Sequence, residues 1–70
     1  MAAVSVQIIV NGEPVTISAM SVLHYLESLS IDPQRVAVEL NLDILPKAAY
    51  GTSVLSDGDR IEIVHFVGGG

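Results

Sequence analysis

The first eighteen residues have the pattern of a β-hairpin. Apolar side chains occupy every second position of the opening segment: Val4, Val6, Ile8 and Val10. This alternation is typical of a strand with one buried face. Asn11-Gly12 follows, a pair that favours a two-residue hairpin turn because both residues accept positive φ. On the return, Val15 and Ile17 share one side. Pro14 indicates the first residue of the strand or a solvent edge, because it cannot donate a main-chain hydrogen bond.

The apolar spacing then changes to that of a helix. The positions on one stripe are Val22, Leu23, Leu26 and Leu29. Steps of three and four residues place side chains on one helical face. Ser21, or Ser18 just upstream, is the expected N-cap. The helix is expected to stop before Asp32-Pro33, because a residue that precedes proline disfavours the helical conformation.

The second half contains three further extended segments. They are the alternating run Val36, Val38 and Leu40, the short piece Ile44–Pro46, and the alternating pair Ile61 and Ile63. Between the last two, Lys47–Val54 has no clear period, although Ala48–Tyr50 fit a short helical turn before Gly51. Ser56–Asp59 indicates a turn. The order β-β-α-β-β-β predicts an α+β chain of the β-grasp (ubiquitin-like) type, a mixed sheet of roughly four to five strands with one main helix packed across it. Residues 1–67 are expected to form this domain, and residues 68–70 a flexible C-terminal glycine arm.

Size and composition favour a binding or carrier role over an enzyme. A domain of 70 residues buries only about 60% of its unfolded surface and has little room for a deep pocket. The absence of cysteine excludes disulfides, thiol catalysis and thiolate zinc sites. A net charge of −5 disfavours nucleic acid and favours a partner protein with a basic patch. Neither a membrane-spanning run nor a signal sequence is evident, so we expect no membrane partner and a cytoplasmic location.

No side-chain cluster predicts catalysis or a metal site. His24 falls on the expected helix and His65 on the last strand, and lone histidines far apart in sequence are more often surface residues than ligands. The eight acidic residues are scattered along the chain. Glu39 and Glu62 are expected to face each other on the outer side of the sheet, where a solvated face explains them better than an acid–base pair. We therefore assign no catalytic residue and no metal ligand.

The sequence finishes with Gly68, Gly69 and Gly70 directly after a hydrophobic strand. A frayed end or a remnant would explain them structurally. A functional explanation is that a glycine arm, which has no Cβ and reaches roughly 10 Å, carries a terminal carboxylate into a buried site of another protein. ATP-dependent adenylation makes such a carboxylate a good acyl donor, and displacement of AMP by a sulfur nucleophile leaves a thiocarboxylate.

The last strand also predicts an interaction surface. If Ile61 and Ile63 point inward, Val64 and Phe66 lie on the outer face, and Ile9 of the first strand belongs to the same outer set. An apolar group on a face that should be wet indicates a partner interface. The alternative is a bulge near the end of the strand that turns Phe66 into the core.

Three segments carry a resemblance to the ThiS family of thiamine-biosynthesis sulfur carriers: IIVNGEPV, VAVELNLDILPKAAY and DGDRIEIVHFVGGG. The resemblance implies that a ThiF-like adenylyltransferase uses ATP and magnesium to adenylate Gly70 as a glycyl adenylate. It implies further that a cysteine desulfurase or another sulfur donor converts this adenylate to 1-thioglycine, and that thiazole synthase takes the sulfur. The carrier itself is then a co-substrate with no bound cofactor.

Other functions stay open at this point. The chain resembles a carrier that serves thiazole formation, but the same chemistry fits sulfur delivery to molybdopterin or to a thiolated cofactor or tRNA. A ubiquitin-like modifier joined to target lysines through Gly70 is a second class. A metal-dependent or hydrolytic mini-enzyme built on His24 and His65 is a third. A free thiocarboxylate separates the carrier from the modifier, which leaves an isopeptide adduct.

Overall fold

The structure is a computed structural model that describes residues 4–67. Its strands are β1 (Ser5–Val10), β2 (Glu13–Ser18), β3 (Val36–Leu40), β4 (Asp43–Leu45) and β5 (Arg60–His65). Its helices are α1 (Val22–Ser28) and two 3₁₀ turns, η1 (Pro33–Arg35) and η2 (Lys47–Ala49). The expected order of strands and main helix is confirmed, and the uncertain stretch after Pro46 begins with a helical turn, as Ala48–Tyr50 indicated.

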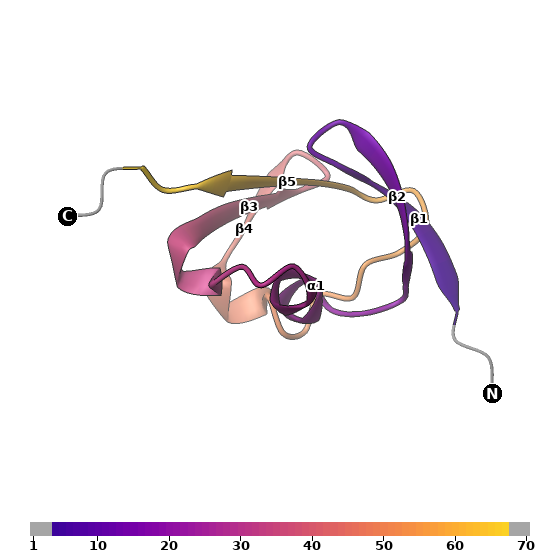
Figure 1. The fold of residues 1–70 in the computed structure, drawn as a ribbon, viewed down its shortest axis with the longest axis horizontal. Coiled ribbons are helices and arrows are strands. Elements are labelled where there is room, and N and C mark those ends of the chain that lie inside the picture. Colours follow the sequence, from indigo (N-terminus) through magenta and orange to yellow (C-terminus); the bar gives the residue numbers. More distant parts are fainter. Residues whose placement is uncertain (1–3, 68–70) are drawn as a thin grey trace.

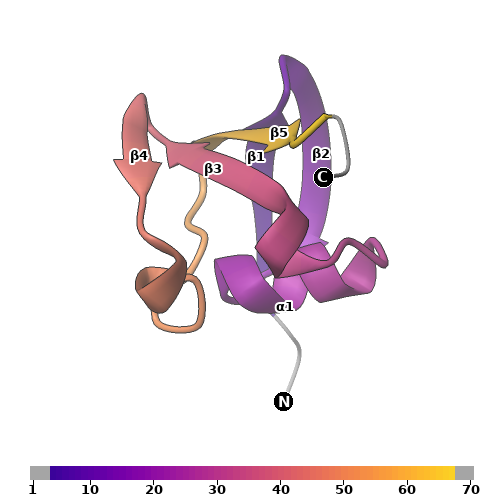
Figure 2. The ribbon, with the colours of Figure 1, turned by 90° about the vertical axis from the view of Figure 1, so that its left-hand side faces the viewer.

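The five strands form one mixed sheet in the order β2-β1-β5-β3-β4. β1 and β5 are parallel, and the other neighbours are antiparallel. α1 covers one face of the sheet, and within residues 4–67 no helix covers the other face (Figures 1 and 2). This is the predicted β-grasp architecture. It places β5, the last strand, in the middle of the sheet, where both of its edges are paired.

The hairpin forms as its alternation predicts. Val6 and Ile8 are buried, and β2 is an edge strand, which accommodates Pro14. Val4 differs from the expectation: it precedes β1 and is 68% exposed, so the buried face begins at Val6. Asn11 and Gly12 both have positive φ, 48° and 87°. The turn therefore has the primed geometry that matches strand twist.

Helix α1 runs from Val22 to Ser28 and is capped by Ser21. The Ser21 hydroxyl accepts a hydrogen bond from the His24 amide at 3.0 Å, which makes Ser21 the N-cap. The residues that α1 buries are Val22, Tyr25 and Leu26. Leu29, expected on the buried stripe, is instead 46% exposed because it is the C-cap and the chain turns away at Ser30, where φ is 59°.

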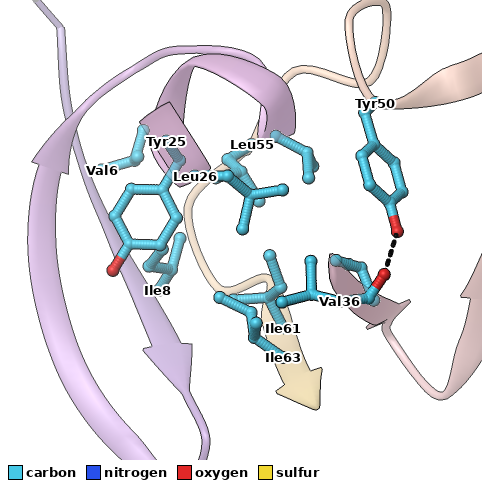
Figure 3. Packing of buried hydrophobic residues seen from close by; sticks show 11 residues of the cluster. Val6, Ile8, Tyr25, Leu26, Val36, Tyr50, Leu55, Ile61 and Ile63 are labelled. Carbon is cyan, nitrogen blue, oxygen red and sulfur yellow. Dashed lines mark hydrogen bonds between the residues drawn. The ribbon is translucent and has the colours of Figure 1, made fainter. Parts of the chain in front are cut away.

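A single core lies between α1 and the sheet (Figure 3). β3 contributes Val36 and Val38, and β5 contributes Ile61 and Ile63, as their alternation predicted. Tyr50 and Leu55, from the stretch between β4 and β5, close one side of this core. Burying a large aliphatic or aromatic side chain stabilises the fold by about 1.5–3 kcal/mol each, so these residues hold β5 firmly in place.

Within the described part of the chain, no helix is long and apolar enough to cross a membrane.

Candidate functional site: the end of the last strand

Strand β5 is held beyond the point where its parallel neighbour ends. β1 pairs with β5 only at Ile9–Arg60 and Val10–Ile61. The Asn11 side chain then takes the place of a strand: its Oδ1 accepts from the Ile63 amide at 2.7 Å, and its Nδ2 donates to the Ile63 carbonyl at 3.1 Å. The Asn11 amide also donates to the Ile61 carbonyl at 3.0 Å. One turn residue therefore extends the pairing on this edge of β5 from Ile61 to Ile63.

Asn41 has the same role at the start of β5, on the side of β3. Its Oδ1 accepts from the Arg60 amide at 2.9 Å, and its own amide donates to the Arg60 carbonyl at 2.7 Å. From the sequence, Asn11 was predicted only as a turn residue. An asparagine in the turn of each hairpin, Asn11 and Asn41, was the available sequence signal. The hydrogen bonds that these side chains make to residues 52 and 19 positions away cannot be read from the sequence.

The described chain leaves the sheet after His65. The Phe66 amide still donates to the Arg35 carbonyl at 2.9 Å, and Val67 is 94% exposed. In Figure 1, β5 leads away from the body of the domain, on the side opposite to β1 and β2. Gly68, Gly69 and Gly70 lie outside the described residues, so the glycine arm stays a prediction.

The predicted interface residues do not form one cluster. Val64 and Phe66 are 54% and 62% exposed, so Phe66 is not turned into the core. Ile9 is half-buried and pairs with Arg60, four residues before Val64 along β5. At about 3.3 Å per residue, the two positions are about 13 Å apart. Ile44 was not predicted as an interface residue. It is 79% exposed and pairs with Glu39 at the β4 edge of the sheet.

Two carboxylates share the centre of the outer face. Glu39 of β3 and Glu62 of β5 are direct cross-strand partners, as expected. Among residues 4–67 the ion pair formed is Arg35–Asp32, at 3.7 Å, so neither glutamate meets a cation within the described chain. Like charges directly opposite each other destabilise a sheet. This face therefore favours a partner that brings positive charge.

The titratable side chains of the core are structural. Burial raises the pKa of the phenols of Tyr25 and Tyr50 above the ordinary value, so both stay neutral at physiological pH. The Tyr50 hydroxyl lies 3.5 Å from the Val36 carbonyl (Figure 3). His24 lies on α1 and His65 at the end of β5. Within residues 4–67, no three histidine, aspartate or glutamate side chains group so as to hold a metal ion.

The fold and the site together define a class: a small ubiquitin-like β-grasp domain whose central last strand leads out to a glycine-rich segment. A sequence model of the ThiS family matches residues 6–70. The chain belongs to the ThiS family.

Solved structures and characterised relatives agree with this assignment. The crystal structure of the thiamine biosynthesis protein ThiS from Geobacter metallireducens matches with a TM-score of 0.79 at 34% identity, over 91% of this chain and 99% of that one. The sulfur carrier protein ThiS of Bacillus subtilis is 49% identical over 45 residues, 64% of this chain and 68% of that protein.

A thiazole synthase of Paramagnetospirillum magneticum is 46% identical over 65 residues, which is 91% of this chain but 20% of that enzyme. The chain therefore spans about a fifth of the length of the thiazole synthases it matches.

Proposed function

We propose that this protein is the sulfur carrier of thiazole formation in thiamine biosynthesis, with the sulfur held on Gly70. The observation that carries the proposal is that the ThiS family match extends through the three glycines to residue 70. The geometry supports it, because β5 pairs with β3 up to His65 and is held on its other edge by β1 and Asn11, so the segment that follows Phe66 starts from a well-held strand.

The proposed chemistry takes place on the carboxylate of Gly70. A ThiF-like adenylyltransferase joins this carboxylate to the α-phosphate of ATP and releases pyrophosphate. A persulfide on a cysteine desulfurase or another donor then attacks the carbonyl, and AMP leaves to give an acyl disulfide. A second thiol of the donor protein reduces this S–S bond, which releases the thiocarboxylate and leaves a disulfide on the donor. Thiazole synthase removes the sulfur and returns the carboxylate. The carrier supplies no catalytic group, and ATP and magnesium belong to the activating enzyme.

Thiazole synthase is the partner with the most direct support. Two thiazole synthases contain a segment that is 46% and 44% identical to this chain. Two proteins that work together are sometimes fused into one polypeptide. A carrier-like segment inside a thiazole synthase therefore supports a functional pairing of carrier and synthase. We propose that the outer face near Val64 and Phe66 docks on these partner enzymes, because both side chains are exposed and adjacent to the segment that carries Gly70.

Intact mass spectrometry of the protein purified from its own cells tests the proposal. We expect a fraction whose mass corresponds to replacement of one oxygen by sulfur, and we expect alkylation by a thiol reagent to label it although the chain has no cysteine. A variant that lacks Gly69 and Gly70 is the control, and it should fold normally but stay unlabelled. Isopeptide adducts on other proteins, without a thiocarboxylate, would instead identify a modifier.

A further inference from the structure

Lys47 is the single lysine of the sequence, and its ammonium group lies against the end of β5. Its Nζ donates to the Val36 carbonyl at 2.8 Å and lies 3.4 Å from the Pro33 carbonyl. These two acceptors belong to the start of β3 and to η1, so the side chain links η2 to both. The charge is thereby fixed at one corner of the domain.

The same ammonium faces two aromatic rings. Its Nζ lies 5.1 Å from the centroid of the Phe66 ring and 5.8 Å from that of Tyr50. Both distances are within the about 6 Å at which a cation is attracted to an aromatic face. Tyr50 is buried in the core, whereas Phe66 is 62% exposed. The ring of Tyr50 is already held by the core, whereas most of the Phe66 side chain is exposed, so the ammonium is the contact that can orient the Phe66 ring.

The main chain of Phe66 is attached to the same corner. Its amide donates to the carbonyl of Arg35, which directly precedes Val36, one of the two residues whose carbonyls Lys47 contacts. We call this arrangement the Lys47 clamp: the Lys47 ammonium, the ring and amide of Phe66, and the carbonyls of Pro33, Arg35 and Val36. It holds both the side chain and the backbone of the last residue before Val67.

We propose that Lys47 is a positioning residue that sets the direction in which the chain leaves β5 toward Gly70. The inference rests on the proposed function, since a direction matters only if Gly70 must enter a partner's site. An adenylation reaction requires the carboxylate to meet ATP in one geometry, and small misplacements of a reacting group reduce rates strongly. A fixed Phe66 gives the chain that follows it one starting position and direction.

A purely structural role explains the arrangement less well. The Val36 carbonyl has a second donor nearby, the Tyr50 hydroxyl at 3.5 Å, so loss of Lys47 does not leave it without a partner. The Pro33 contact is exposed, where water replaces a lost donor. Lys47 therefore contributes little that the fold cannot supply otherwise, except the contact with Phe66.

The test compares Lys47→Met, Lys47→Arg and Arg35→Met in the full chain. Methionine keeps the apolar stem without the charge, whereas arginine keeps the charge and the attraction to the ring. Arg35→Met is the matched control, because it removes a nearby cation whose side chain contacts Asp32 and keeps the main-chain carbonyl that belongs to the clamp. Two measurements are made: hydrogen exchange of the Phe66 amide, and kcat and KM for adenylation by a ThiF-like enzyme, followed by pyrophosphate release.

Lys47→Met is expected to speed exchange of the Phe66 amide about tenfold, as loss of a charged contact would, while the Ile61 and Ile63 amides are unchanged. It is expected to lower kcat about tenfold or more with KM within about twofold, because docking persists while the carboxylate is misplaced. Lys47→Arg should restore both quantities, and Arg35→Met should match the unmodified protein.

The failures of the two proposals are distinguishable. If Lys47→Met leaves Phe66 exchange and kcat unchanged, or raises KM alone, Lys47 does not position the arm, although the carrier function stands. If Arg35→Met lowers kcat as much as Lys47→Met, charge at this corner matters and the clamp does not. If the unmodified protein accepts no AMP at all, the proposed function itself is wrong, whereas the exchange measurement still reports whether Lys47 holds Phe66.

Discussion

At the scale of single residues, one side-chain amide replaces a missing piece of strand. β1 ends beside Ile61, yet β5 continues to His65 with its parallel edge uncovered. Asn11 fills this gap, because a carboxamide carries an acceptor and a donor with nearly the spacing of a peptide group. Its positive φ of 48° turns the side chain back toward β5, a conformation that asparagine tolerates better than most residues.

Replacing this side chain should destabilise the domain. Asn11→Ala removes two hydrogen bonds to Ile63 and leaves a β-carbon at positive φ, so we expect a loss of about 3 kcal/mol in the free energy of unfolding. Asn11→Gly removes the same bonds without the conformational strain, and we expect a loss of about 2 kcal/mol. Urea denaturation followed by circular dichroism measures both. A glycine variant as stable as the unmodified protein would show that the amide pairing adds nothing.

At the scale of elements, the two hairpins use the same turn with different residues. Asn11-Gly12 joins β1 to β2 with φ values of 48° and 87°, and Asn41-Leu42 joins β3 to β4 with values of 52° and 73°. Glycine adopts such angles freely, whereas a leucine there is strained. Leu42 is also 78% exposed, so its side chain gains little from the fold in return. The second hairpin therefore carries a local cost that the first does not.

Relieving this strain should stabilise the domain. Leu42→Gly is expected to raise the free energy of unfolding by about 0.5–1 kcal/mol, measured by thermal or urea unfolding. The reverse change is its control: Gly12→Leu should cost about 1–2 kcal/mol, since a Cβ at Gly12 meets no atom within 4 Å and the penalty is conformational. A destabilised Leu42→Gly variant would mean that Leu42 makes contacts worth more than its strain.

The elements themselves were predictable, whereas the contacts that hold the site were not. Periodicity located the hairpin, the helix, β3 and β5, because burial of one face imposes a spacing on the sequence. It placed Ile61 and Ile63 in the core and Val64 outside, and both placements are confirmed. The Asn11–Ile63 pairing and the Lys47–Phe66 contact join residues far apart in the chain, and no local pattern records them. The prediction that Leu29 is buried was wrong, because Leu29 caps the end of α1 and the apolar face of the helix stops there.

At the scale of the whole molecule, the two faces of the sheet differ: one is covered by the helix and the other carries acidic side chains. One face is buried under α1, and the other carries Glu39 and Glu62 side by side in a chain with a net charge of −5. Repulsion between these carboxylates weakens the isolated domain slightly. A basic partner surface would relieve it on docking, and long-range attraction would accelerate the encounter. The pair thus favours binding at a small expense in stability.

Glu62→Gln should therefore change stability and binding in opposite directions. Removal of one carboxylate is expected to raise the free energy of unfolding by about 0.5 kcal/mol, because the cross-strand repulsion disappears. It should weaken association with the proposed partner, a ThiF-like adenylyltransferase, roughly threefold to tenfold. The main cause is a slower association rate, and this rate should depend less on salt than that of the unmodified protein. Surface plasmon resonance at two ionic strengths, together with thermal unfolding, measures both effects.

The matched control is Glu13→Gln, which makes the same change in charge at the first residue of β2, away from Glu39. It should leave both stability and association close to those of the unmodified protein, because surface substitutions without specific contacts have small effects. Equal weakening of association by the two variants would mean that only the overall charge of the domain steers the partner. A Glu62→Gln variant that binds as fast as the unmodified protein at low salt would place the docking surface elsewhere on the molecule.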